Sequence, residues 1–339
     1  MHFAMTDQAP TWHWGIFFVR PREKIMKKFK YPLVFFSGFV LAIFVCALFA
    51  FTDTGSKNFT ESNSKNFANK ASNENKWYAP ALPEQLSFAG EQVPLHRWDV
   101  REKFDKEYFK IYYEQGNILY LLKLAERNFP IISEILKANG VPDDFKYVCV
   151  AESNMQGWAV SKAGAVGYWQ FMSATAPGYG LELNSLVDER RHLEKATDAA
   201  CKYFKQAYNK FGNWTAAAAS LNCGMGGYNK QATFQKTTKY YDLFLPEETN
   251  KYIFRIVSFK HVMENASDLG FIIDEKEKYQ DIPVENITVT SSIANLSDFA
   301  EKHGTNYKVL RMMNPWLTGR SLTVGGGRKY IIKVPGRQE

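Results

Sequence analysis

The sequence predicts a mainly α-helical protein with an N-terminal transmembrane helix and a small β-α-α-β unit at its C-terminus. Three observations lead to this fold class. Apolar residues recur at helical spacing from about Phe104 to Ala266, without an alternating strand series. An uncharged run, 31–52, precedes that region. From Glu285 onward, short β-type runs flank two helical ones.

The run 31–52 is long enough to cross a bilayer, since a helix of ~20 apolar residues spans the hydrocarbon core. Lys27, Lys28 and Lys30 stand directly before it. Because positive residues beside a membrane helix favour the cytoplasmic side, we expect residues 1–30 to form a short cytoplasmic segment. The sequence thus predicts a single membrane anchor, with the rest of the chain on the opposite side.

A cleaved signal peptide or a lipoprotein signal is the alternative interpretation of this run. No clean small-residue cleavage site follows it, and Val45 stands before Cys46, where a lipoprotein signal has a small residue. Both observations favour the anchor. Met26 followed by two lysines also resembles a natural start with a basic segment, which would make residues 1–25 an over-extended gene prediction.

The net charge of +7 suggests a polyanion partner, but its distribution argues against nucleic acid. Residues 1–51 carry a net +4 and the remainder only +3, so much of the excess is a topology signal. The 4 cysteines form no CxxC pair, and only 6 histidines are present. We therefore expect no metal site and no cofactor.

The chain after the anchor divides into a linker and a helical domain. Residues 53–80 are rich in Asn, Ser and Lys and cannot bury a core, so we expect a linker there. Residues 81–268 are predicted to form one helical domain, in which Pro at helix starts and Gly after helix ends mark the boundaries. Its helices are predicted at 117–128, 130–140, 142–152, 192–211, 213–222 and 247–266.

Residues 285–336 are predicted to form a separate small unit. Asn286–Ser291 and Tyr330–Val334 have the composition of strands. Between them, a segment beginning near Leu296 and a second one, Tyr307–Asn314, have helical spacing. The order gives a β-α-α-β unit.

The stretch 147–181 carries the residues best suited to chemistry. Glu152 ends an apolar helical segment, and burial would raise the pKa of its carboxyl and suit it to general acid catalysis. Ser153 could bind a substrate or orient the acid. Aromatic side chains that could stack on sugar rings and a glutamine follow, in the block Gly167, Tyr168, Trp169, Gln170, Phe171 and Met172. On composition alone, a solvated Glu152 with Trp169 and Phe171 in a plain core is the alternative.

Five motifs stand in one order along residues 85–266: Ala151–Ser153, Ala165–Met172 with Tyr179–Leu181, Asp188–Arg191 with Ala196–Thr197, Leu221–Gly224, and Glu248–Tyr252. In this order they resemble the motifs of the membrane-bound lytic murein transglycosylase D family, whose catalytic domain is similar to goose lysozyme. Two positions depart from the family pattern. Leu221 stands where the family usually has Tyr, and His192-Leu193 replaces a common Asp-Pro.

The resemblance implies a lysozyme-like fold and cleavage of the β-1,4 bond between N-acetylmuramic acid and N-acetylglucosamine, giving 1,6-anhydro products. It implies that Glu152 acts first as acid and then as base. This is consistent with the absence of an acidic neighbour along the sequence before Glu182. Peptidoglycan would be the partner, and the catalytic domain would lie in the periplasm. The implied substrate-binding residues are Ser153, Gly167, Tyr168, Trp169, Gln170, Met172, Asn222 and Tyr252.

The C-terminal unit resembles a LysM domain, which binds glycans that contain N-acetylglucosamine. The shared features include Val289, Leu296, Asn314-Pro315 and Val334-Pro335. The usual G-D-T-L turn is replaced by residues 292–296, so a degenerate unit kept for packing is the alternative.

Three other functions stay open at this point. A non-catalytic peptidoglycan-binding scaffold would keep the cleft and the C-terminal unit without turnover. A hydrolytic muramidase would release reducing sugars instead of anhydro sugars. A lysozyme linked to sporulation or secretion would act on a special region of the wall.

Overall fold

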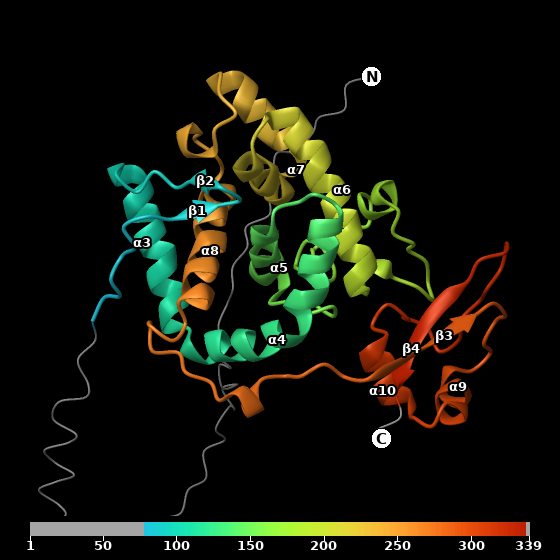
Figure 1. Cartoon of the computed structure of the whole chain (residues 1–339). Helices are drawn as coiled ribbons and strands as arrows, with labels where there is room; N and C mark the ends of the chain where they lie inside the picture. The colour runs from blue at the N-terminus through green and yellow to red at the C-terminus, as the bar shows by residue number, and fades with distance from the viewer. Residues whose placement is uncertain (1–77, 337–339) are drawn as a thin grey trace, which may run out of the picture. The chain divides into compact units, whose positions relative to one another are not determined.

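The computed structural model describes residues 78–336, and within them the predicted mainly helical architecture is confirmed (Figure 1). A short hairpin comes first, formed by β1 (Ser87–Phe88) and β2 (Glu91–Gln92). Six helices of the larger domain follow: α3 (Trp98–Tyr113), α4 (Gln115–Ala138), α5 (Lys146–Ser153), α6 (Leu193–Phe211), α7 (Trp214–Gln235) and α8 (Glu247–Glu264).

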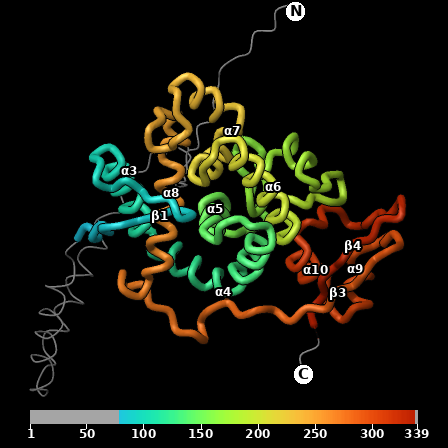
Figure 2. The backbone as a smooth tube through the Cα atoms, turned by 45° about the horizontal axis from the view of Figure 1, so that its top comes forward, coloured from blue at the N-terminus to red at the C-terminus, as the bar shows by residue number. Residues whose placement is uncertain are grey.

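Helix α5 lies in the middle of this domain, where Figure 1 and Figure 2 both show the longer helices around it. It packs against α4 and α8, while α3 packs against α8 and α6 against α7. Fully buried aromatic rings fill the core beside it. The ring centroids of Phe145 and Phe204 lie 4.4 Å apart, and those of Trp169 and Phe204 lie 5.8 Å apart. A helix enclosed in this way holds its side chains in fixed positions.

Local sequence explains the junction between α6 and α7. Helix α6 ends at Gly212, whose φ of 76° is the left-handed conformation that glycine adopts without strain. Asn213 then begins α7, and its side-chain oxygen accepts a 2.8 Å hydrogen bond from the Ala216 N–H. The fully buried Ala216–Ala219 run lets α7 approach its neighbours closely.

Two predicted helix boundaries were wrong. Pro130 was expected to begin a new helix, but α4 continues through it from Gln115 to Ala138. Proline removes one backbone donor and bends a helix rather than ending it when both sides bury an apolar face, and Figure 1 shows α4 bent along its length. Helix α7 continues past the expected end at Asn222, after a break at Gly224.

The C-terminal unit has the predicted β-α-α-β order. It consists of β3 (Val284–Val289), α9 (Leu296–Lys302), α10 (Tyr307–Met313) and β4 (Tyr330–Pro335). The two strands are antiparallel, with Val284 opposite Pro335 and Val289 opposite Tyr330. Its own small core includes Leu296, Leu310, Trp316, Leu317, Leu322, Ile332 and Val334.

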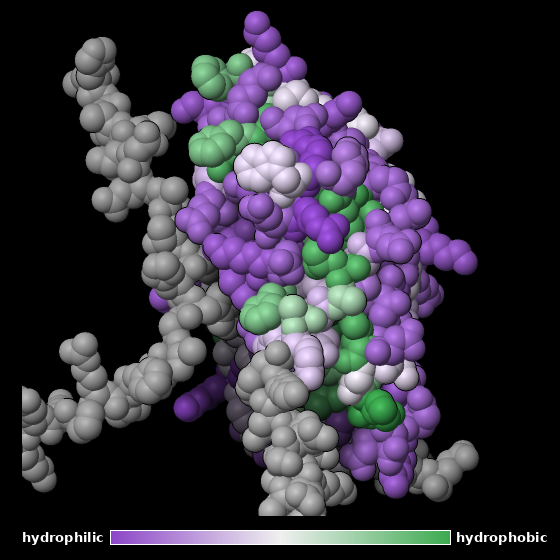
Figure 3. Space-filling model, turned by 90° about the vertical axis from the view of Figure 1, so that its left-hand side faces the viewer, coloured by the Kyte–Doolittle hydropathy of each residue, from purple (hydrophilic) through white to green (hydrophobic). Residues whose placement is uncertain are grey.

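Hydrophilic side chains cover most of the face shown in Figure 3, and hydrophobic ones form small patches among them.

Across residues 78–336, no helix combines the length and apolar character needed to cross a bilayer. The predicted anchor 31–52, the cytoplasmic segment 1–30 and nearly all of the linker 53–80 lie outside the described residues.

Candidate active site

Glu152 lies in the last turn of α5, and its carboxylate oxygen Oε1 accepts a short hydrogen bond from the hydroxyl of Tyr252 on α8. The chain then leaves α5 through Asn154, which adopts a left-handed φ of 52°. Tyr252 is only 1% exposed. Because α5 packs directly against α8, two residues that are 100 positions apart in sequence meet here.

Burial raises the pKa of the Glu152 carboxyl to about 7, since the ionised form loses solvation. The hydrogen bond from Tyr252 and the positive charge of Arg255 lower this pKa, and the negative charge of Glu248 raises it. The carboxyl can therefore hold or release a proton near neutral pH. That property is what a group acting as acid and then as base needs.

Glu248 is a second carboxylate near Glu152 that sequence reasoning did not include in the site. Two cations hold it: Lys251 Nζ lies 2.8 Å from its Oε2, and Arg255 Nη2 lies 3.0 Å from its Oε1. Positions 248, 252 and 255 share one face of α8 at i, i+4 and i+7 spacing. That spacing is the signal that could have identified Glu248 and Arg255 from the sequence.

Asn222 lies on α7 beside α8. Its side-chain oxygen accepts a 2.8 Å hydrogen bond from the hydroxyl of Thr249, which fixes the orientation of the amide. Two residues later, Gly224 has φ 74° and ψ 146°, so the helix is interrupted there. The structure thus links Asn222 to the helix that carries Tyr252.

Ser153 is held by backbone groups at the end of α5. It is 7% exposed, and its hydroxyl lies 2.8 Å from the Tyr168 carbonyl and 3.2 Å from the Cys149 carbonyl. The hydroxyl also accepts a hydrogen bond from the Gln156 N–H at 3.3 Å. Through these backbone partners, Ser153 ties the loop of Tyr168 to α5, and its contact with a substrate stays a prediction.

For Trp169, the structure agrees with the alternative interpretation, in which the ring belongs to the core. Its side chain is fully buried, and its indole N–H donates a 3.0 Å hydrogen bond to the Thr197 hydroxyl on α6. Phe171 is 2% exposed. A large apolar ring with one polar atom is most stable where burial and a hydrogen bond coincide, and α6 provides both.

The other residues of this block remain partly accessible. Tyr168 and Gln170 are half-buried and Met172 is 40% exposed. Gln170 adopts a left-handed φ of 51°, and its side-chain amide donates to the Gly167 carbonyl at 2.9 Å. Of the predicted aromatic residues, Tyr168 is therefore the one with surface left for a ligand.

Gly167 is buried and acts through its backbone. Its φ is 84°, and a Cβ atom added there would lie 1.9 Å from the Arg190 carbonyl oxygen. Its N–H donates to the Ala159 carbonyl at 2.9 Å. Only glycine fits where these two backbone segments touch. Gly167 therefore has a packing role, and its contact with a substrate stays a prediction.

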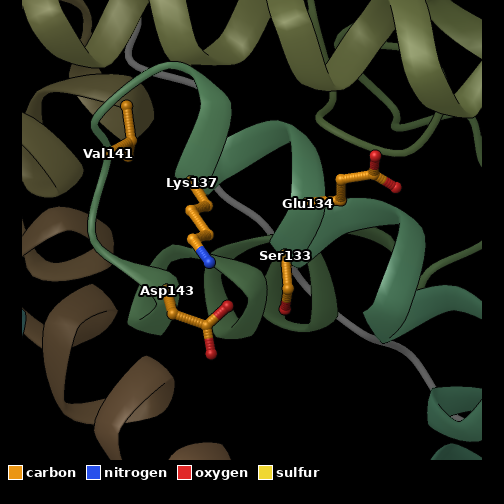
Figure 4. Close-up of a pocket in the computed structure, with 5 residues that line it drawn as sticks. All are labelled: Ser133, Glu134, Lys137, Val141 and Asp143. Carbon is orange, nitrogen blue, oxygen red and sulfur yellow. The ribbon is translucent and has the colours of Figure 1, made fainter.

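A pocket of about 540 Å³ lies away from these residues, beside α4 (Figure 4). Ser133, Lys137 and Asp143 converge on it, whereas Glu134 points away. None of the predicted site residues lines it.

No three side chains of His, Cys, Asp or Glu gather as a metal-binding group within residues 78–336. The thiols of Cys149, Cys201 and Cys223 are free, and burial raises the pKa of each. Thiols held in the protonated form are poor nucleophiles.

Comparison with known families assigns both units. A family model described as the transglycosylase SLT domain matches residues 129–244. A second, described as the soluble lytic transglycosylase C-terminal LysM-like domain, matches residues 285–338. The chain therefore carries an SLT transglycosylase domain followed by a LysM-like domain. Glu152 and Asn222 lie inside the first match, and Tyr252 lies just after it.

Particular relatives carry a more specific name. The chain is 24% identical over 202 residues to the membrane-bound lytic murein transglycosylase D of Escherichia coli K12, and equally to that of E. coli O6:H1 strain CFT073. The match covers 58% of this chain and 44% of each relative, so it spans less than half of their length. A solved structure of an inactive mutant of lytic transglycosylase Slt from Pseudomonas aeruginosa is 22% identical, with a TM-score of 0.35, over 45% of this chain and 26% of that one.

Replacing Gly167 by alanine tests the close approach of the two backbone segments. We expect Gly167→Ala to lower the free energy of unfolding by about 2–4 kcal/mol, because strain at a left-handed position adds to overpacking. Gly178→Ala is the matched control, since an added Cβ meets nothing within 4 Å there. Urea unfolding of both variants measures the difference, and equal stabilities would contradict the close approach.

Replacing Tyr252 by phenylalanine tests the electrostatic balance at Glu152. The Tyr252 hydrogen bond lowers the pKa of Glu152 by stabilising its ionised form, so Tyr252→Phe is expected to raise that pKa further above about 7. Carbon-13 NMR titration of labelled glutamate side chains measures it. Tyr208→Phe, at a partly exposed ring on α6, serves as control. An unchanged or lowered pKa in Tyr252→Phe would contradict the assigned contact.

Proposed function

We propose that this chain is a peptidoglycan lytic transglycosylase. It cleaves the β-1,4 bond between N-acetylmuramic acid and N-acetylglucosamine and leaves a 1,6-anhydromuramyl end. One observation carries the proposal. The carboxyl of Glu152 changes its protonation state near neutrality, while Glu248, the other carboxylate that acts on it, is neutralised by two cations. The SLT domain and the similarity to murein transglycosylases support the same chemistry.

In the first step, Glu152 is protonated and donates its proton to the glycosidic oxygen. The bond from that oxygen to C1 of the muramic acid residue breaks, and the N-acetylglucosamine side leaves as an alcohol. Positive charge develops at C1, and the sugar's own N-acetyl group stabilises it. Burial favours the protonated acid before the step, and Tyr252 stabilises the carboxylate that the step forms.

In the second step, the Glu152 carboxylate removes the proton from the C6 hydroxyl of the same sugar. The C6 oxygen then bonds to C1 and closes the 1,6-anhydro ring. Glu152 regains its proton, so the cycle is balanced without water. A hydrolase would instead need a carboxylate free to activate a water molecule. Glu248 suits that role poorly, because Lys251 and Arg255 each occupy one of its two carboxylate oxygens.

The proposed contacts with the glycan strand come from the accessible residues around Glu152. We propose that Asn222 and Gln170 bind the N-acetyl and neighbouring groups, and that Tyr168 and Met172 cover the apolar face of a sugar. The buried residues Ser153, Gly167 and Trp169 are proposed to hold in place the loop that carries Tyr168 and Gln170. The LysM-like domain is proposed to bind glycan strands in the same polymer.

We also propose that the enzyme is anchored in the cytoplasmic membrane through residues 31–52, with its catalytic domain in the periplasm. The uncharged run and the lysines before it support this orientation. The name of the E. coli relatives, membrane-bound, agrees with an envelope location.

The anchor predicts how the native chain fractionates. We expect the full chain to sediment with membranes and to resist extraction by high salt, because an apolar helix is held by the hydrophobic effect and not by charge. The same chain without residues 1–52 should appear in the soluble fraction. Recovery of the full chain in the soluble fraction would contradict the anchor.

Glu152→Gln tests the catalytic assignment. The amide has the shape of the carboxyl but cannot donate its proton to the leaving oxygen, so we expect release of anhydro-muropeptides to fall by at least ~1000-fold. Purified sacculi are digested with the full-length protein, and the products are identified by mass spectrometry. Glu102→Gln, on the exposed side of α3, is the matched control.

The products distinguish the alternatives. Anhydro ends from the unmodified chain, absent with Glu152→Gln, support the lytic transglycosylase. Reducing ends would replace it by a hydrolytic muramidase. Binding of sacculi without any release would indicate the non-catalytic scaffold, and near-normal activity of Glu152→Gln would remove Glu152 from the reaction.

A further inference from the structure

The LysM-like domain is joined to the catalytic domain by more than the intervening segment of chain. Residues 182–194, which follow the aromatic block, contact the C-terminal unit through their backbone. The Asp188 N–H donates to the Trp316 carbonyl at 2.8 Å, and the Thr318 N–H donates to the Leu186 carbonyl at 2.8 Å. Val187 and Leu317 form an antiparallel bridge between them.

Side chains reinforce this contact. Val187 is 1% exposed and belongs to the same apolar cluster as Leu296 and Ile332, so a residue of the catalytic segment completes the core of the LysM-like domain. The rings of His192 and Trp316 are stacked, with centroids 5.7 Å apart. Val187 therefore cannot move out of the core of the LysM-like domain without exposing apolar surface and opening a cavity.

Charged and polar side chains bind both ends of residues 182–194 to the LysM-like domain. Glu182 accepts hydrogen bonds from the Tyr330 hydroxyl at 3.0 Å and from Arg328 at 2.8 Å. At the other end, Lys333 forms a short ion pair with Glu194. Burial raises the pKa of the Glu194 carboxyl, but the hydrogen bonds with His192 and Lys333 outweigh it and lower this pKa to about 2.

The opposite side of the same segment supports the loop 157–171. Asp188 binds Arg190 through two 2.8 Å hydrogen bonds, and Arg190 Nη1 donates to the Phe171 carbonyl at 3.1 Å. Arg191 Nη1 donates to the Gly157 carbonyl at 3.3 Å. The Arg190 carbonyl is the group that presses against Gly167.

The loop 157–171 is in turn hydrogen-bonded to the end of α5, next to Glu152. The Tyr168 carbonyl, one residue beyond Gly167, accepts a hydrogen bond from Ser153, the residue directly after Glu152. An unbroken series of contacts therefore runs from Trp316 through Asp188 and Arg190 to the loop and on to the end of α5.

We propose that the LysM-like domain is a positioning element of the active site. By binding residues 182–194, it holds the loop 157–171 in the conformation that presents Tyr168 and Gln170 beside Glu152. This inference rests on the proposed function for its effect on turnover, but the structural coupling can be measured without activity. A LysM-like domain that acted only as a tethered binding domain would affect attachment to the wall. It would leave the reaction on short substrates unchanged.

The structure offers a matched pair of variants in the LysM-like domain. A Cβ added at Gly319 would lie 2.4 Å from Leu186 Cδ2 and 3.4 Å from Leu186 Cα, so the β-branched side chain of Gly319→Val would crowd both the side chain and the backbone of Leu186. Gly325→Val is the control, because its added Cβ meets nothing within 4 Å. Neither glycine has a positive φ, so the backbone itself accepts both substitutions. A second test, Glu182→Gln with Glu194→Gln, weakens the polar ends and leaves both cores intact.

Two readouts on the full-length protein test the proposal. Hydrogen–deuterium exchange of peptides covering 157–171 should become faster in Gly319→Val, and to a smaller degree in the double glutamine variant, with Gly325→Val unchanged. On a soluble tetrasaccharide of the glycan strand, kcat should fall about tenfold in Gly319→Val, since a small misplacement of the loop disturbs the reacting geometry.

Slow exchange of 157–171 and normal kcat in Gly319→Val, with only sacculus binding reduced, would overturn the proposal and leave an independent binding domain. If the unmodified chain releases no anhydro product, the proposed function fails instead. The exchange comparison still decides the coupling in that case, so the two failures are distinguishable.

Discussion

The contact between the Glu152 carboxyl and the Tyr252 hydroxyl is the interaction on which the rest of the site depends. It joins the last turn of α5 to the second turn of α8, and both helices are held by a closely packed aromatic core. Burial favours the protonated carboxyl, whereas Tyr252 and Arg255 stabilise its ionised form. The opposing effects place the pKa at about 7, where one group can donate and then accept a proton.

The residues around Glu152 differ in role according to how deeply they are buried. Glu248, Lys251 and Arg255 form an ion network along one face of α8, which sets the local electric field. Ser153, Gly167 and Trp169 are buried and fix the path of the loop. Tyr168, Gln170, Met172 and Asn222 keep some surface. The accessible side chains of the candidate site thus lie over buried ones that hold the loop 157–171. Residues 182–194 connect this loop to the LysM-like domain.

Much of the fold could be predicted because the helices of this chain carry local signals. Gly212 and Asn213 mark the junction of α6 and α7, and the change of period at residue 285 marks the C-terminal unit. The boundary at Pro130 was predicted wrongly, because packing of α4 on both sides of the proline outweighs its local preference. Trp169 stands in an aromatic block, which fits either a sugar platform or a plain core, and its burial and its contact with Thr197 place it in the core.

The sequence by itself determined the helical class and the order of the motifs, because both are local features. It proposed Glu152 as the acid through the resemblance of the Ala151–Ser153 motif to a known family. The tertiary structure alone decided which groups surround that acid. Tyr252, Glu248 and Arg255 reach it from α8, and the LysM-like domain reaches the loop beside it through Asp188 and Arg190. Such contacts join residues far apart in the chain, and they depend on how helices pack, which no local pattern specifies.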